Sequence, residues 1–143
     1  MSIYVEVSAV VERPVEDVFR IHATEHVRNH PRWDPDMQLE QITDGPLGVG
    51  TMIKRINSRS GMPVEGTMEV VEFEPNKSVG MIIKDGPVEI RAFAVYEAKG
   101  PEQTILTLKT EFTGLDESVD KSTLTNQMEN AVQNHKRFIE SEP

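Results

Sequence analysis

The fold is decided by the stretch Ser118–Ser141, which reads SVDKSTLTNQMENAVQNHKRFIES. It contains no proline or glycine, and its less polar residues recur at steps of four, three, four and three, which is typical of one face of an α-helix. That face consists of Leu124, Met128, Ala131, His135 and Phe138. At a rise of about 1.5 Å per residue the helix has a length on the order of 30 Å. A helix of this length needs a large apolar surface against which to bury its stripe.

The rest of the chain offers such a surface in the form of a β-sheet. Residues 3–11 alternate between apolar and polar side chains, which predicts a first strand. Six further runs rich in strand-forming residues follow, separated by short turns that contain glycine or proline. The predicted strands are Met37–Thr43, Thr51–Arg59, Val64–Phe73, Ser78–Lys84, Val88–Ala98 and Gln103–Phe112. Their short connections favour sequential antiparallel hairpins.

Two short helices are expected between the first strand and the other six. One begins after Pro14, a residue suited to the first helical turn. The other follows Thr24 and ends before Pro31, with an irregular segment over residues 31–36. The order of elements predicts a single α+β domain, residues 1–143, in which a curved antiparallel sheet wraps around the C-terminal helix and encloses an apolar ligand pocket.

The composition excludes several classes of function. The formal net charge of −9 disfavours nucleic acid and anionic membranes as partners. Without cysteine there are no disulfides, thiolate nucleophiles or cysteine metal sites. No segment resembles a signal peptide or approaches the roughly 20 apolar residues of a membrane span. We therefore expect a cytoplasmic protein. No Ser-His-Asp order, phosphate-binding glycine loop or paired carboxylates are present, and no cofactor is indicated.

Four short motifs resemble those of the START-like superfamily, also called the polyketide cyclase/dehydrase and lipid transport group (SRPBCC), which includes the birch-pollen-allergen-like proteins. They occur in the expected order over nearly the whole chain: VERPVEDVF (residues 11–19), PRWDP (31–35), TDGPLGVGT (43–51) and VEFEPN (71–76). The resemblance implies a helix-grip fold, with seven antiparallel strands around the terminal helix and a cavity between them. Members bind lipids, sterols or quinones or cyclise polyketides, so the fold leaves the function open.

Three histidines, His22, His26 and His30, are spaced four apart and would lie on one face of an unbroken helix. Such a pair of histidines can hold zinc. Thr24, however, has the character of a helix start, and no further ligand is in view. We therefore predict no metal site and interpret the three as exposed or capping residues.

The catalytic candidates are His135, Tyr96 and Arg91, although the sequence assigns a catalytic role to none of them. His135 lies on the apolar stripe and should face the cavity, where it either contacts a ligand, acts as a base or simply packs at the helix end. Ile90, Ala92, Ala94 and Tyr96 share one strand face, and which face points inward is open.

Charged residues within the strands are expected on the solvated convex face. They are Arg55, Glu65, Glu69, Arg91 and Lys109. If Arg55 or Arg91 points inward instead, it would suit a ligand carboxylate or enolate. Trp33, between two prolines, either closes the end of the sheet or gates the cavity mouth.

The sequence favours a protein that binds a small-to-medium hydrophobic ligand, such as a lipid, a polyketide or a quinone-like molecule, without catalysis. The predicted ligand-binding residues are Met52, Ile56, Met68, Tyr96, Met128, His135 and Trp33. One alternative is a polyketide cyclase/aromatase or dehydratase that uses polar cavity residues. Another is a protein–protein interaction module with a filled cavity. A homodimer through an exposed sheet edge is possible in each case.

Overall fold

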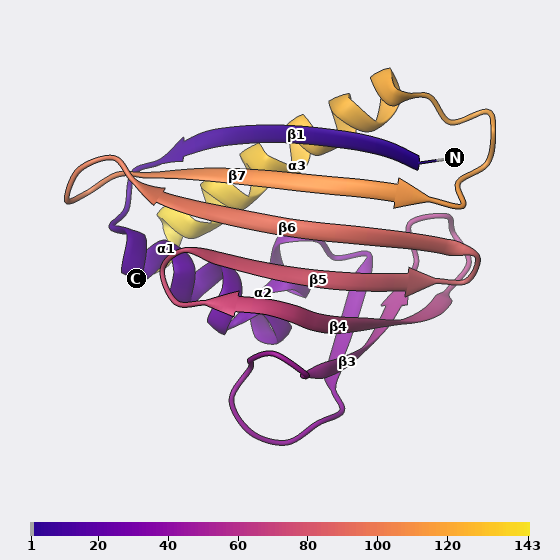
Figure 1. Cartoon of the computed structure of the whole chain (residues 1–143), viewed down its shortest axis with the longest axis horizontal. Helices are drawn as coiled ribbons and strands as arrows, with labels where there is room; N and C mark the ends of the chain where they lie inside the picture. Colours follow the sequence, from indigo (N-terminus) through magenta and orange to yellow (C-terminus); the bar gives the residue numbers. More distant parts are fainter. Residues whose placement is uncertain (1) are drawn as a thin grey trace.

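The computed structural model describes residues 2–143 as an α+β fold with one antiparallel sheet (Figure 1). The strands are β1 (Ser2–Val11), β2 (Met37–Gln41), β3 (Met52–Asn57), β4 (Val64–Glu74), β5 (Ser78–Asp85), β6 (Val88–Ala98) and β7 (Thr104–Thr113). The helices are α1 (Val15–Phe19), the π-helical turn η1 (Arg20–Thr24), α2 (His26–Trp33) and the long α3 (Lys121–Ser141). All seven predicted strands and the terminal helix are present.

The sheet is open, with β1 and β2 at its edges, and its order places the first strand beside the last. Its strand order is β1-β7-β6-β5-β4-β3-β2, and every pair is antiparallel. Ser2 pairs with Thr113, and the register continues to Val11 opposite Thr104. In Figure 1 α3 lies behind the sheet on the β1 side, whereas α1 and α2 lie behind the strands of the opposite side. The predicted helix-grip architecture is confirmed.

The long helix begins at Lys121, three residues later than predicted. Its N-cap is Asp120, whose carboxylate accepts a hydrogen bond of 2.8 Å from the backbone N–H of Thr123. Such a cap supplies one of the acceptors that the first helical turn lacks. On the buried face Leu124, Val132 and Ile139 are almost inaccessible to water and fix α3 against the sheet.

The segment after β1 runs further as helix than the sequence predicts. α2 continues through Pro31 to Trp33, and the N–H of Asp34 donates to the carbonyl of His30 at 2.9 Å. The prediction that the helix ends before Pro31 is therefore wrong. Proline costs the helix one backbone hydrogen bond, and the packing of Trp33, described below, holds this last turn in place.

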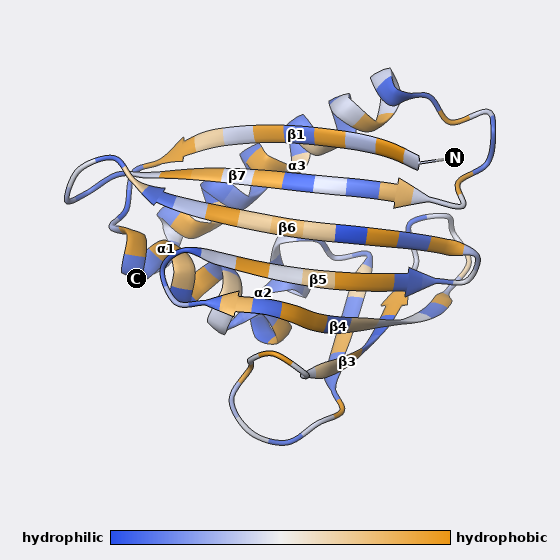
Figure 2. Cartoon of the chain, in the orientation of Figure 1, coloured by the Kyte–Doolittle hydropathy of each residue, from blue (hydrophilic) through white to orange (hydrophobic). Residues whose placement is uncertain are grey.

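The alternation along the strands distinguishes the two faces of the sheet (Figure 2). On β6 the face with Ala94 and Tyr96 is the buried, concave one, whereas Arg91 is exposed on the opposite face. No helix formed by residues 2–143 is both long and apolar enough to cross a membrane.

Candidate functional site

A cavity of about 520 Å³ lies between the concave face of the sheet and α3. Its apolar wall includes Met68, Met81, Ile83, Ala92 and Leu108 from the strands and Met128 and Ala131 from α3. Small side chains at Ala92, Ala94 and Ala131 leave the space open. The end of the cavity near α2 is different, because polar and aromatic rings gather there.

Of the residues predicted to bind a ligand, four line this cavity: Trp33, Met68, Met128 and His135. Tyr96 is buried on the concave face beside them and contacts the cavity residue His22. Whether these residues bind a ligand stays a prediction.

The placement of Met52 and Ile56 at the cavity wall is wrong. Opposite residues of an antiparallel pair share a face, and Met52 is paired with the exposed Glu69. Ile56 borders a separate shallow groove with residues of β2 and β3. The inward residues of β3 are instead Ile53 and Arg55, both buried. The alternation of this strand is too mixed for the sequence to show which face is buried.

All four histidines of the chain meet at the polar end of the cavity. His22 Nε2 lies 2.9 Å from His135 Nδ1, so η1 and α3 are joined by a hydrogen bond between two imidazoles. His22 Nδ1 lies 2.6 Å from the hydroxyl of Tyr96 on β6. The chain Tyr96–His22–His135 therefore crosses from the sheet to the terminal helix.

A second chain of hydrogen bonds runs along η1 and α2. His26 Nδ1 lies 3.0 Å from the backbone carbonyl of His22, and His26 Nε2 lies 2.9 Å from His30 Nδ1. The helix is interrupted at Glu25, but all three rings lie on one side, because His22, His26 and His30 each contact Trp33. The interpretation of these histidines as exposed or capping residues is wrong.

Trp33 is the aromatic centre of the cluster. Its ring stacks on His22 at 5.3 Å and on His30 at 5.4 Å between centroids, and it contacts His135 at 4.7 Å. The indole Nε1 is buried and has no hydrogen-bond partner among the described residues. An unpaired buried donor costs about 1–3 kcal/mol. Trp33 also lines the cavity.

Burial keeps the histidines uncharged. Loss of hydration lowers the pKa of His26 to about 4 and that of His135 to about 3. The pKa values of His22 and His30 are also lowered well below their usual range, first by burial and then by the neighbouring histidines, to which Arg55 adds for His30. Burial raises the pKa of the Tyr96 phenol well above its ordinary value. At neutral pH the cluster is a network of neutral donors and acceptors.

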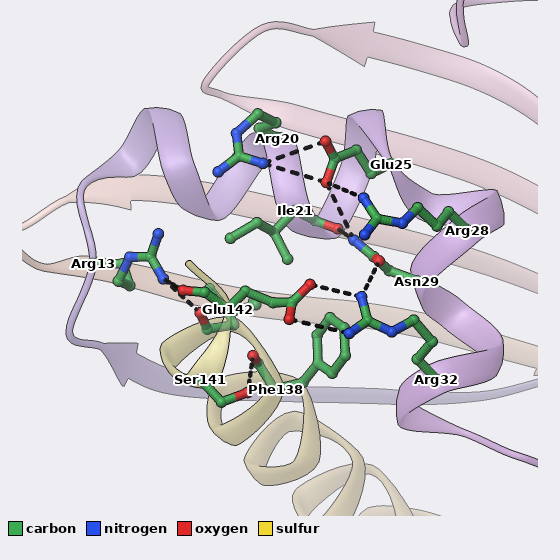
Figure 3. Close-up of polar contacts among 11 residues, drawn as sticks. Arg13, Arg20, Ile21, Glu25, Arg28, Asn29, Arg32, Phe138, Ser141 and Glu142 are labelled. Atoms are coloured by element: carbon green, nitrogen blue, oxygen red, sulfur yellow. Dashed lines mark hydrogen bonds and ion pairs between the residues drawn. The ribbon is translucent and has the colours of Figure 1, made fainter.

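A polar clamp holds α2 against the end of α3 (Figure 3). The guanidinium of Arg32 forms two hydrogen bonds with the Glu142 carboxylate, of 2.6 and 3.1 Å, and lies 4.7 Å from the centre of the Phe138 ring. Buried Asn29 donates to the carbonyl of Ile21 at 2.8 Å, which ties α2 to η1. The clamp therefore joins the elements that carry the histidines.

Arg55, another cavity residue, corrects the prediction that the strand charges all face solvent. It is only 4% exposed and forms an ion pair with Asp85, itself 7% exposed. Arg55 Nε lies 3.1 Å from both carboxylate oxygens, and Asn57 donates to one of them at 3.2 Å. Gly66 on β4 is paired with both Arg55 and Asp85, and a Cβ there would collide with the backbone carbonyl of Lys84 and with the Asp85 carboxylate.

The other predicted strand charges, Glu65, Glu69, Arg91 and Lys109, are exposed. Arg91 therefore lies on the convex face, away from the cavity, and the suggestion that it supplies catalysis there is wrong. Among residues 2–143 no group of three histidine or acidic side chains has a geometry that could hold a metal ion. The histidines instead form two hydrogen-bonded pairs, His22 with His135 and His26 with His30.

Solved structures share this fold. Ara h 8.0201 aligns with a TM-score of 0.75 at 13% identity, over 98% of this chain and 96% of its own. A START superfamily protein from Mycobacterium smegmatis gives a TM-score of 0.74 at 12% identity, over 96% and 94% of the two chains. Norcoclaurine synthase from Thalictrum flavum, in complex with dopamine and hydroxybenzaldehyde, gives 0.70 at 15% identity, over 100% and 90%.

These comparisons confirm the resemblance to START-like proteins at the level of the fold. No family model matches the sequence, and the comparison with curated proteins found no match. At such low identities the comparisons show a shared fold only, and the chemistry must be inferred from the residues of this chain.

Proposed function

We propose that this chain binds a small-to-medium hydrophobic ligand in the cavity between the sheet and α3. The observation that carries the proposal is the cavity itself, whose volume of about 520 Å³ lies within the range of small-molecule sites. Most of its wall is apolar, and a few polar groups converge at one end, which is the usual arrangement of a site that binds and orients an organic molecule.

The charges around the cavity favour a ligand that carries no net charge. Arg55 is paired with Asp85, and Arg59 at the mouth is paired with Asp34. The lowered pKa values keep the histidines neutral, so among the described residues that line the cavity no unpaired cation remains for a carboxylate. An apolar molecule with one neutral oxygen-bearing end, such as a ketone or a phenol, matches this wall. Norcoclaurine synthase, which has this fold, was solved with two aromatic molecules.

An interaction module with a filled cavity finds no support in a cavity of this size. The enzymatic alternative has one observation in its favour, because it requires at least two polar side chains within hydrogen-bond reach of each other at the cavity wall. His22 and His135 meet this requirement at 2.9 Å.

Native mass spectrometry of freshly purified protein, followed by solvent extraction, tests the proposal. We expect a bound mass that is released into the organic phase, or stoichiometric binding of an added neutral dye such as Nile red. The matched control is Ala92→Phe, which places a ring inside the cavity without changing charge. Binding that is equally strong in the wild type and in this variant contradicts the proposed location, and no binding of either kind contradicts the proposal.

A further inference from the structure

The two histidine chains end at the cavity with opposite hydrogen-bonding character. Tyr96 has a single partner among the described residues, His22 Nδ1, and a buried hydroxyl must place its hydrogen in a bond. Tyr96 therefore donates to His22 Nδ1. A neutral His22 then carries its proton on Nε2 and donates to His135 Nδ1. A neutral His135 in turn carries its proton on Nε2, where it presents an N–H donor.

The second chain has the reverse direction. A backbone carbonyl can only accept, so His26 Nδ1 carries the proton that bonds to the carbonyl of His22. A neutral His26 then accepts at Nε2 from the Nδ1–H of His30. His30 Nε2 is left as an unprotonated nitrogen. Neither His30 Nε2 nor His135 Nε2 has a hydrogen-bond partner in residues 2–143, and neither is among the fully buried atoms.

The free donor and the free acceptor belong to rings that line the same cavity and pack on the same indole. Trp33 contacts His30 at 5.4 Å and His135 at 4.7 Å between ring centroids. A donor and a base that line one apolar pocket and contact the same indole match a carbonyl oxygen and the acidic C–H group next to it.

The geometry points to an enolisation site, in which His30 Nε2 removes the α-proton of a neutral ketone while His135 Nε2–H holds the carbonyl oxygen. This inference rests on the proposed binding function and adds a reaction to it. In the forward step the C–H bond breaks and its proton bonds to His30 Nε2. The electron pair forms the C=C bond of an enolate, whose negative oxygen accepts the hydrogen bond from His135. The reverse step returns a proton to carbon, so no co-reactant is consumed.

The surrounding groups suit this division of roles. Burial raises the pKa of the Tyr96 phenol, which disfavours transfer of its proton along the chain, so His135 remains a fixed donor. Burial, followed by the neighbouring His26 and Arg55, lowers the pKa of His30 well below its usual range. The lowered pKa of His30 also keeps its Nε2 unprotonated at neutral pH.

Exchange of the α-protons of 1-tetralone in deuterated buffer, followed by ¹H NMR, measures this step. Saturation-transfer NMR on the same sample measures binding independently. We expect exchange at least about tenfold faster with the wild-type protein than in buffer. We expect His30→Gln to bind 1-tetralone but lose the acceleration, because an amide is not a base. Lys109→Gln, on the exposed convex face, controls for catalysis by a surface amine and should behave as the wild type.

Each alternative result is decisive. Binding of 1-tetralone without acceleration, or acceleration that His30→Gln retains, overturns the enolisation site and leaves the binding proposal standing. Absence of binding at millimolar ketone overturns both. If circular dichroism shows that His30→Gln is unfolded, His135→Phe takes its place. Loss of the oxygen-holding donor should then slow exchange by about 100-fold or to the buffer rate, and an unchanged rate overturns the proposal.

Discussion

Acid should destabilise this protein well before its carboxylates begin to titrate. The perturbation is a change from about pH 7.5 to about pH 5, and the responsible groups are the four histidines of the cluster, of which His22 is buried and the others are half-buried. Their pKa values are lowered in the folded protein, whereas an unfolded histidine titrates near about 6.5. The unfolded chain therefore binds more protons as the pH falls below that value, and the folded state loses stability.

The magnitude follows from the two groups with defined values. The pKa of His26 is lowered to about 4 and that of His135 to about 3. Both are still neutral at pH 5 in the folded state, so each costs about 2 kcal/mol of stability relative to pH 7.5. His22 and His30 shift in the same direction and add to the loss. Two such losses are a large fraction of a typical folding free energy of about 5–15 kcal/mol.

The assay is urea unfolding at about pH 7.5, 6 and 5, followed by the fluorescence of Trp33 and by circular dichroism. This window separates histidines from carboxylates. Glu140 and Glu142 have lowered pKa values in the folded protein. The stability that they contribute is therefore present above about pH 4.5 and is lost only below it. The matched variant His26→Gln should lose about 2 kcal/mol less than the wild type over the same range. A free energy of unfolding that is constant or rises toward pH 5 would refute the neutral, buried cluster.

Three further predictions concern the structures that support the cavity. Asp85→Asn leaves the buried cation of Arg55 without its counter-ion and should lower the free energy of unfolding by about 3–5 kcal/mol in urea titrations; a loss below about 1 kcal/mol would contradict the ion pair. Gly66→Ala inserts a Cβ against the Asp85 carboxylate and should lower the free energy of unfolding by about 1–3 kcal/mol. An unchanged midpoint of thermal unfolding would contradict this close packing of β4 against its neighbours. Glu142→Gln weakens the clamp on Arg32, so the amides of α2 should exchange with deuterium faster while those of β6 and β7 do not; equal rates in α2 would argue against the clamp.

The terminal helix and the strands were predictable because their signals are local. The stripe from Leu124 to Phe138 and the turns between the strands depend on residues a few positions apart. The ends of the elements were less certain, since Asp120 acts as a cap only in the folded geometry. The prediction at Pro31 failed, because the tendency of proline to end a helix is outweighed here by the packing of Trp33 on four imidazoles.

The site was only partly predictable because its contacts are distant in sequence. The spacing of His22, His26 and His30 was visible, but their partner His135 lies more than a hundred residues further on. Nothing local indicates that Asp85 neutralises Arg55 or that Gly66 makes room for it. The apolar stripe of the terminal helix was a usable signal, because it identified the cavity residues Met128 and His135.

The pairing of the first strand with the seventh has a consequence for the order in which the molecule can assemble. β1 finds its hydrogen-bonding partner only in β7, with Ser2 opposite Thr113. The apolar faces of β1 and α1 therefore stay exposed until β7 and α3 have been synthesised. Topologies dominated by such distant contacts fold slowly and stay vulnerable to aggregation meanwhile. A hydrophobic ligand that binds during folding would affect this slow folding step as well as the stability of the folded protein.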